Sequence, residues 1–441
     1  MIVLFSGLLF YATAVVIYRL YFHAISGFPG PKLAAVTSLY EFYFDVINDG
    51  TFIWEVQRMH EKYGPIVRIT PHELHVKDPN FYDEIYAGAT RPRNRYLPSI
   101  RMLGLPQSSA ATVEHDLHRS RRRVLTSYFS KQSVMRLESL INKKIEKLLK
   151  RFEKFHEDGT VVRLDSAFSA LAGDITSHYT YGYSYDYLDH EVFRNDVREA
   201  IINLLGIGHI AKFFPFIPFM LRNIPQRVVR WYHPGAAQVL EFRNTLRRQS
   251  IETLRNSGRG HREDQTIFDA LNDPRLEKQE RTISRLENEA FLILAAGTET
   301  TAQPLNVILF HLLDNKRLLS KLHYEMKQIM PELNSFVSWT SLEKIPYLRA
   351  VVYEGIRLAN GPMSRLPRVA PNEALKYQGW VIPPGTPVSE YGYFVHRDEN
   401  IFPNPHQFDP ERWIESDNRG GHLENKIVAF SRGSRQCVGQ K

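Results

Sequence analysis

The only cysteine of the chain, Cys437, lies in a loop whose residue types suit a metal-bound sulfur. The loop covers residues 430–439 and reads Phe-Ser-Arg-Gly-Ser-Arg-Gln-Cys-Val-Gly. Gly433 and Gly439 would let backbone approach closely and direct N–H groups at the sulfur. Arg435 presents a planar fork that matches a carboxylate. The alternative is an inert cysteine in a glycine-rich turn, which is common when a cysteine stands alone.

A second pair of reactive side chains, Glu299 and Thr300, lies within the sequence Ala-Gly-Thr-Glu-Thr-Thr at 296–301. An acid next to a hydroxyl is the arrangement that proton delivery to a reacting group needs. The alternative is a threonine-rich turn on a core helix, because such tracts are frequent.

Three further charged residues are spaced for ion pairing. Glu354 and Arg357 are three positions apart and so share a helical face, and Arg412 follows within Phe-Asp-Pro-Glu-Arg-Trp at 408–413. Taken alone, most such pairs are solvated surface pairs worth under about 1 kcal/mol.

A basic run at 118–123 reads His-Arg-Ser-Arg-Arg-Arg, and nucleic-acid binding is the obvious alternative function for it. The run lacks interleaved aromatic residues and any recognised nucleic-acid module, which disfavours that function. His118 and Arg122 are four positions apart and share one helical face. The net charge of +8 favours acidic partners, and anionic lipid, nucleic acid or an acidic redox protein would all serve.

The amino terminus predicts an element that holds the rest at a membrane. Residues 1–18 carry no charge and form a helix nearly long enough to cross a bilayer, and Arg19 and Lys32 follow them. No Lys or Arg precedes the apolar run, which favours a retained anchor over a cleaved signal peptide and places the body in the cytosol. The lone cysteine excludes intramolecular disulfides, in agreement with that compartment. The prolines at 28–31 predict a stiff hinge.

The body reads as mainly helical with a minor sheet. Strand character is found at 66–69 and 74–76, and the segment 377–394 returns to strands and turns. Helical periodicity covers 134–155 and 285–313, the latter being the longest such pattern and the one that carries Glu299 and Thr300. A composition of 43% hydrophobic and 24% charged residues is that of an ordinary globular core.

With these motifs in this order, the chain resembles the cytochrome P450 family over essentially its whole length beyond the hinge. The resemblance implies a fold that is mainly α with a small β region, preceded by one transmembrane helix. It divides the chain into an anchor at 1–22, a proline-rich hinge at 23–33 and a catalytic domain at 34–441. It also implies haem b (iron protoporphyrin IX), with Cys437 as the metal ligand, since a thiolate pushes electron density onto the iron.

The resemblance assigns roles to single residues. Thr300 and Glu299 would be catalytic, with Thr300 hydrogen-bonding to dioxygen and Glu299 relaying protons, while Gly297 would leave room over the haem. A triad beneath the haem, structural in role, would consist of Glu354, Arg357 and Arg412. The residues expected to hold the haem are Cys437, Arg435, Phe430, Gly433, Gly439, Arg368, Arg122 and His118, the last standing where the family usually has tryptophan. Substrate contacts are expected from loop 97–112 and from Ala296, Met363 and Leu366.

Within the family, the segments 30–33, 60–71 and 74–76 look most like fungal secondary-metabolite members of the trichodiene-oxygenase type. Such enzymes hydroxylate or epoxidise an apolar terpenoid or polyketide intermediate, using O2 and electrons from NADPH. The partners implied are a lipid bilayer and an NADPH-cytochrome P450 reductase, for which the remaining arginines of the basic run would form a docking patch. We expect a single-pass protein of the endoplasmic reticulum membrane with a cytosolic catalytic domain, and no nucleic-acid partner.

The main departure from the family lies at the carboxyl end. Family members normally continue through a further helix and a hairpin, whereas four residues follow Cys437 here. We therefore expect a truncated chain, and two alternatives to the monooxygenase stay open. One is a catalytically inactive membrane-bound remnant. The other is a haem-thiolate isomerase or dehydratase that needs no reductase, which the presence of Glu299 and Thr300 disfavours.

Overall fold

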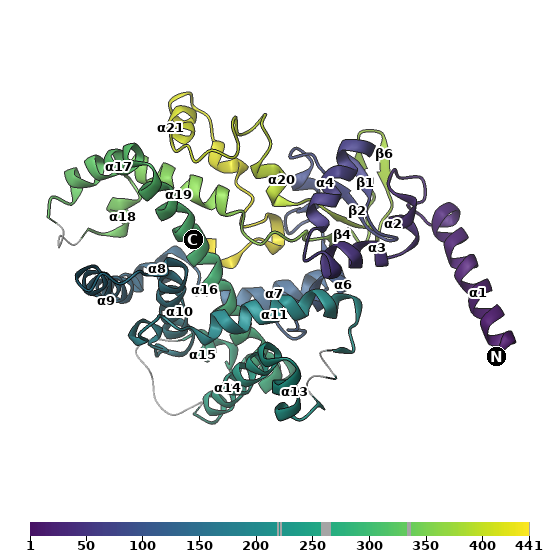
Figure 1. Ribbon diagram of the computed structural model, residues 1–441, viewed down its shortest axis with the longest axis horizontal. Helices are drawn as coiled ribbons and strands as arrows, with labels where there is room; N and C mark the ends of the chain where they lie inside the picture. The colour runs from purple at the N-terminus through teal and green to yellow at the C-terminus, as the bar shows by residue number, and fades with distance from the viewer. Residues whose placement is uncertain (218–219, 221–222, 257–265, 333–336, 441) are drawn as a thin grey trace.

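The computed structural model describes residues 1–217, 220, 223–256, 266–332 and 337–440. Within them the expected mainly α architecture with a small β region is confirmed, and most of the longer helices lie on one side of the body while the strands and several shorter helices lie near the amino-terminal helix (Figure 1). The helices are α1 (Ile2–Ile17), α2 (Lys32–Val36), α3 (Leu39–Phe42), α4 (Phe52–Tyr63), α5 (Tyr82–Ile85), α6 (Leu97–Arg101), α7 (His115–Thr126), α8 (Lys131–Arg136), α9 (Glu138–Glu157), α10 (Leu164–Tyr181), α11 (Asp196–Phe213), α13 (Gln226–Tyr232), α14 (Pro234–Asn256), α15 (Ile267–Leu271), α16 (Ile283–Asp314), α17 (Lys316–Ile329), α18 (Trp339–Leu342), α19 (Pro346–Ala359), α20 (Gly392–His396) and α21 (Glu411–Asn418).

The strands are short, and the larger sheet joins segments from both halves of the chain. They are β1 (Ile66–Arg68), β2 (Leu74–Val76), β3 (Asn94–Arg95), β4 (Arg368–Val369), β5 (Leu375–Tyr377), β6 (Trp380–Ile382) and β7 (Pro387–Ser389). One sheet has the order β1-β2-β7-β4-β3, with β2 and β7 parallel, and β5 pairs with β6 in the other. Antiparallel pairing of β3 with β4 places Arg95 directly opposite Arg368.

Short helical turns connect several of these elements. The π-helical segments are η1 (Tyr18–Phe22) and η2 (Tyr43–Ile47). The 3-10 segments are η3 (Tyr187–Asp189), η4 (Lys278–Arg281), η5 (Leu423–Lys426), η6 (Gly433–Arg435) and η7 (Val438–Gln440). The last two flank Cys437 on either side.

Helix α16 runs through the middle of the helical side and organises its core. Its Thr282 side chain caps the first turn by accepting from the Arg285 N–H, as expected for a threonine at this position. Leu286, Ala290, Phe291 and Leu294 are buried along one face, where they join apolar residues of α10 and α14 in a single cluster. This packing fixes the position of the stretch 296–301 within the molecule.

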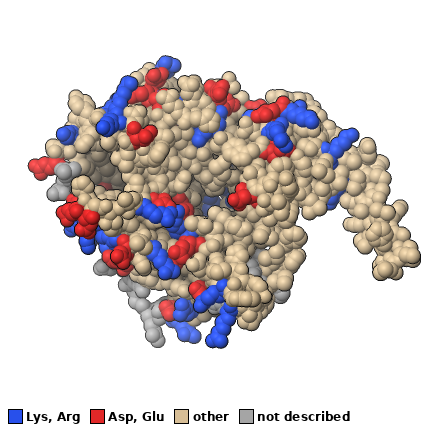
Figure 2. Space-filling view, viewed as in Figure 1, with Lys and Arg blue, Asp and Glu red and all other residues tan. Residues whose placement is uncertain are grey.

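Helix α1 projects from the body and exposes its apolar side chains (Figures 1 and 2). The continuous helical segment Ile2–Phe22 is the one helix among the described residues that is long and apolar enough to cross a membrane. Its base is tied to the body, because the buried Arg68 guanidinium donates to the Arg19 carbonyl at 2.8 Å and to the Pro71 carbonyl at 2.7 Å. The Arg68 N–H also donates to the Pro29 carbonyl, so the proline segment lies against β1.

Candidate haem-thiolate site

The cysteine loop is held in one conformation by backbone hydrogen bonds. The Cys437 N–H donates to the Phe430 carbonyl at 2.8 Å, and the Gln436 N–H donates to the Gly433 carbonyl at 3.1 Å. From α7, the Arg122 guanidinium donates to the Gln436 carbonyl. Cys437 itself is exposed and is not part of a disulfide. The thiol is therefore presented at the surface of an ordered loop, as a ligand must be.

Gly433 occupies a position that no other residue fits. Its φ of +72° lies in the left-handed region, and a Cβ atom there would stand 2.1 Å from the carbonyl oxygens of both Tyr86 and Ala87. The Ser434 N–H donates to the same Ala87 carbonyl at 3.1 Å. A close approach of two backbones therefore anchors the cysteine loop, whereas a Cβ at Gly439 would come no nearer than 3.9 Å to the Cys437 sulfur.

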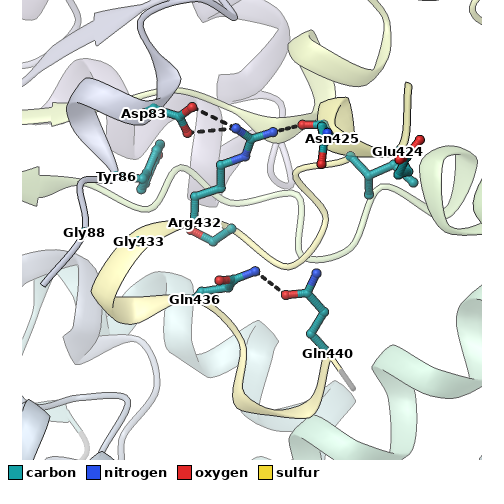
Figure 3. A pocket seen from close by; sticks show the side chains of 11 residues that line it. Asp83, Tyr86, Gly88, Glu424, Asn425, Arg432, Gly433, Gln436 and Gln440 are labelled. Carbon is teal, nitrogen blue, oxygen red and sulfur yellow. Dashed lines mark hydrogen bonds and ion pairs between the residues drawn. The ribbon is translucent and has the colours of Figure 1, made fainter. Parts of the chain in front are cut away.

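A polar pocket of about 400 Å³ lies beside the loop (Figure 3). Arg432 reaches across it from the loop, donating to both carboxylate oxygens of Asp83 at 2.8 and 2.9 Å and to the Asn425 carbonyl. Gln436 and Gln440 face each other at its other side and are hydrogen-bonded. These contacts brace the cysteine loop against α5 and the segment at 424–427.

A cluster of buried cations lies next to the loop. Arg368 and Arg435 are 3% and 5% exposed, and Arg95 is half-buried. Arg435 donates to the carbonyls of Arg93 at 3.0 Å, Thr112 at 2.6 Å and Val113 at 2.7 Å. Burial, followed by the charge of Arg368, lowers the pKa of Arg435 to about 9. Burial and then the charges of Arg368 and Arg435 hold the pKa of Arg95 well below its ordinary value.

These cations fit the two propionate carboxylates that a haem carries. Arg95 Nε and Arg368 Nη2 are buried and lack a hydrogen-bond partner within the described residues. Buried charged donors are costly unless an anion pairs with them, and like charges directly opposite on two strands destabilise a sheet. A carboxylate between Arg95 and Arg368 would remove both costs, since a guanidinium matches a carboxylate in a fork. The cluster is thus suited to hold an acidic cofactor edge beside Cys437.

His118 belongs to this cluster and is neutral. Burial first, and then the charges of Arg435, Arg95 and Arg122, lower its pKa to about 2. It lies one turn before Arg122 on α7 and is 5% exposed. A neutral imidazole can still donate one hydrogen bond to a carboxylate.

The face of α16 that carries Ala296 and Thr300 is exposed, although much of the helix is buried. The Thr300 hydroxyl donates to the Ala296 carbonyl one turn earlier. Because Pro304 has no N–H, the Thr300 carbonyl receives no helical bond from that position. The hydrogen bond to Ala296 keeps the Thr300 hydroxyl on the exposed face, where a small ligand can reach it.

Glu299 is held by two neighbouring helices. The Ser169 hydroxyl of α10 donates to its Oε1 at 2.5 Å, and Arg198 of α11 donates to its Oε2 at 2.8 Å. Arg198 also donates to Asp165 at 2.8 Å, which links both acids through one guanidinium. Glu299 is therefore part of an ion-pair network, and about a quarter of its side chain is exposed to solvent. Any proton that Glu299 relays must pass through this network.

Gly297 lies where α16 packs against α10. A Cβ atom at this position would stand 2.6 Å from the Thr176 hydroxyl of α10. The absent side chain thus allows α10 and α16 to pack closely, and the space that it is expected to leave over a cofactor stays a prediction.

Glu354, Arg357 and Arg412 come together in a buried network. Arg357 forms a bidentate pair with Glu354 at 2.7 and 2.9 Å, and Arg412 Nε donates to Glu354 at 3.2 Å. Glu354 also accepts from the Asp409 N–H at 2.9 Å and from Trp413 Nε1 at 3.0 Å. Glu354 and Arg357 are both 0% exposed, so the network joins α19, α21 and the segment between them as an internal support.

The basic run on α7 is not a uniform surface patch. Arg121 is 9% exposed and pairs with Glu280 through two hydrogen bonds of 2.8 Å. Arg119 and Arg123 are exposed. The expected docking patch therefore loses Arg121, because its guanidinium is taken up by Glu280 of η4 and by the Thr112 hydroxyl.

The predicted substrate residues lie on separate elements. Met363 is 45% exposed, Leu366 packs against the apolar cluster around the larger sheet, and Ala296 is on α16. The sequence alone does not single out Arg95. This residue is the third arginine of Arg-Pro-Arg-Asn-Arg at 91–95, and such a run looks like an ordinary charged surface segment until its partner strand is known.

Comparison with known proteins identifies what this chain is similar to. The family model described as Cytochrome P450 matches residues 37–441. Conidiogenone synthase PchP450 of Penicillium rubens is 50% identical over 441 residues, covering 100% of this chain and 88% of that protein. Cytochrome P450 monooxygenase TRI4 of Trichoderma arundinaceum is 43% identical over 422 residues, covering 96% and 82%.

A solved structure agrees with the fold. The crystal structure of a cytochrome P450, CYP102L1, superposes with a TM-score of 0.70 and covers 88% of this chain and 84% of that chain at 17% identity. The predicted likeness to fungal secondary-metabolite proteins of the trichodiene-oxygenase type is confirmed by the TRI4 match.

Proposed function

This chain belongs to the cytochrome P450 monooxygenase family, a family that implies haem, and we propose that it oxidises an apolar secondary-metabolite intermediate. The reaction inserts one oxygen atom from O2 into an unactivated C–H or C=C bond, giving an alcohol or an epoxide. The second oxygen atom leaves as water, with two electrons from NADPH passed through a reductase and two protons from solvent.

The observation that supports this most is the accessible Cys437 thiol next to buried arginines that lack an anion. Cys437 would ligate the iron, and Arg95, Arg368, Arg435, Arg122 and His118 would hold the propionates. When bound, the haem supplies the redox chemistry that no amino-acid side chain offers. Gly433 and the backbone bonds of residues 430–437 would keep the sulfur in place.

The protein's own residues would manage protons above the cofactor. The Thr300 hydroxyl lies on the exposed face of α16 and would hold a proton at Oγ1 near the O2 substrate. Glu299 would relay protons from solvent once its bond to Arg198 opens. Their presence supports a monooxygenase over an isomerase or dehydratase, which needs no such delivery.

The substrate we propose is a terpenoid or polyketide. The most direct support is the 50% identity to a protein named conidiogenone synthase, and a protein named cytochrome P450 monooxygenase TRI4 is 43% identical. Ala296, Met363, Leu366 and loop 97–112 would form the contacts. We further propose that Ile2–Phe22 anchors the chain in the endoplasmic reticulum membrane, with the body in the cytosol beside its reductase.

Two measurements test the proposal. Reduced membranes that contain residues 1–441 should give the thiolate-ligated Soret band with carbon monoxide, and Cys437→Ser should abolish it. With a reductase and NADPH, extracts that contain the substrate of conidiogenone synthase should yield a product heavier by one oxygen atom. Absence of the band would favour the inactive remnant, and turnover without NADPH would favour the isomerase or dehydratase.

A further inference from the structure

The loop at 105–113, between α6 and α7, is largely buried and internally hydrogen-bonded. Leu105, Ser108 and Thr112 are at most 4% exposed. The Ser108 hydroxyl donates to the Leu105 carbonyl at 2.8 Å, and the Ala111 N–H donates to the Ser108 hydroxyl at 3.2 Å. Leu105 also packs in the apolar cluster that contains α16. This loop therefore has a defined shape that outside contacts can fix or release.

A fully buried carboxylate on α16 holds the middle of the loop. Glu289 is 0% exposed and accepts from the Ser109 N–H at 2.7 Å and from the Ser109 hydroxyl at 2.5 Å. Arg285, one turn earlier, pairs with the same carboxylate. The neighbouring Asn288 side chain accepts from the Gln107 N–H at 3.1 Å. Two adjacent residues of α16 thus bind two backbone N–H groups of the loop.

The far end of the loop is fixed to the cysteine loop. Arg435 donates to the carbonyls of Thr112 and Val113 at 2.6 and 2.7 Å. Arg121 of α7 donates to the Thr112 hydroxyl at 3.0 Å. The loop therefore spans the distance between α16 and the cation cluster, and side chains hold its backbone at both ends.

We propose that Glu289 is a positioning residue that fixes loop 105–113 and through it the orientation of the apolar substrate, an inference that rests on the proposed function. A buried carboxylate that accepts from a backbone N–H, a hydroxyl and a guanidinium makes strong charge-assisted bonds. Loss of its charge frees the loop, because the carboxylate is bonded to the loop backbone itself. The effect falls on substrate binding and leaves the bond between Cys437 and the iron in place.

The test compares Glu289→Gln with Asp174→Asn in the full chain. Asp174 is also 0% exposed and accepts from a lysine, Lys144, and from the backbone N–H groups of Tyr187 and Leu188, but it holds a different loop. In Glu289→Gln, hydrogen exchange of amides 107–112 rises about tenfold or more, the effect expected when a charged hydrogen bond is lost. The substrate KM rises roughly fivefold or more while kcat changes less than about twofold. In Asp174→Asn the exchange increase is confined to 185–188 and KM is unchanged.

A second, milder variant tests the same contact in case Glu289→Gln does not fold. Ser109→Ala keeps the ion pair of Glu289 with Arg285 and removes one hydroxyl bond, so exchange and KM change in the same direction by a smaller factor. The inference is overturned if Glu289→Gln leaves amides 107–112 protected, or if the loop loosens and KM stays as in wild type. Hydrogen exchange needs neither haem nor substrate. A wild-type protein without turnover would therefore defeat the proposed function, while the exchange comparison would still decide whether Glu289 holds the loop.

Discussion

Replacing Arg368 with glutamine should stabilise the haem-free protein and weaken its hold on haem. Arg368 and Arg95 are cross-strand partners, for which Cα atoms lie about 5 Å apart. Two unit charges at that separation repel by roughly 3 kcal/mol at an effective dielectric constant of about 20. Because long side chains can diverge, we expect Arg368→Gln to raise the free energy of unfolding of the haem-free protein by about 1–2 kcal/mol.

The same substitution removes a charged donor for a propionate. A hydrogen bond to a charged group contributes about 1.5–3 kcal/mol, so the Kd for haem should rise roughly 10- to 100-fold. Urea unfolding of the haem-free protein, followed by tryptophan fluorescence, measures the first effect. Transfer of haem to excess apomyoglobin measures the second.

Arg91→Gln is the matched control, because Arg91 lies in the same segment as Arg95, the partner of Arg368, but is 38% exposed and pairs with Glu84 and Glu373. Its loss should change neither quantity by more than about 1 kcal/mol. If Arg368→Gln destabilises the haem-free protein and leaves haem transfer unchanged, Arg368 is not an uncompensated cation that awaits a carboxylate, and the cluster has been misinterpreted.

Three more predictions follow from buried groups. Glu354→Gln leaves Arg357 without a charged partner and should cost about 3–5 kcal/mol in urea unfolding, against under about 1 kcal/mol for Glu411→Gln, whose side chain is 36% exposed; equal losses would refute the supporting role. Gly433→Ala should abolish the thiolate Soret band because its Cβ meets two carbonyls, whereas Gly420→Ala, with a φ of +70° but open space, should keep the band and cost only about 1 kcal/mol. Burial, then the charges of Asp78 and Asp398, raise the pKa of Glu390 well above 4.5, so the unfolded chain releases this proton at lower pH than the folded one. Stability should therefore fall as pH rises above 4.5, and Glu390→Gln should flatten this slope in urea unfolding between pH 4 and 8; an unchanged slope would show that Glu390 is ionised when folded.

Local patterns in the sequence predicted single elements well. The helix expected at 285–313 is observed as Ile283–Asp314, and the strands at 66–69 and 74–76 are found within one residue. The pattern at 134–155 is two helices, α8 and α9, with a break at Leu137. Apolar spacing continues across a break of one residue, so periodicity alone does not reveal it.

The sequence by itself determined the chemistry of this protein: a lone thiol between glycines, an acid beside a hydroxyl, and the family to which their order belongs. These features depend on residue types within a few positions of one another. The tertiary structure alone decided which distant groups meet. Strand pairing places Arg95 opposite Arg368, and helix packing brings Glu289 into contact with Ser109. Packing also pairs Arg121 with Glu280 and brings Gly297 close to Thr176. Such contacts depend on strand register and on how helices pack, and neither is encoded by the spacing of residues along one segment.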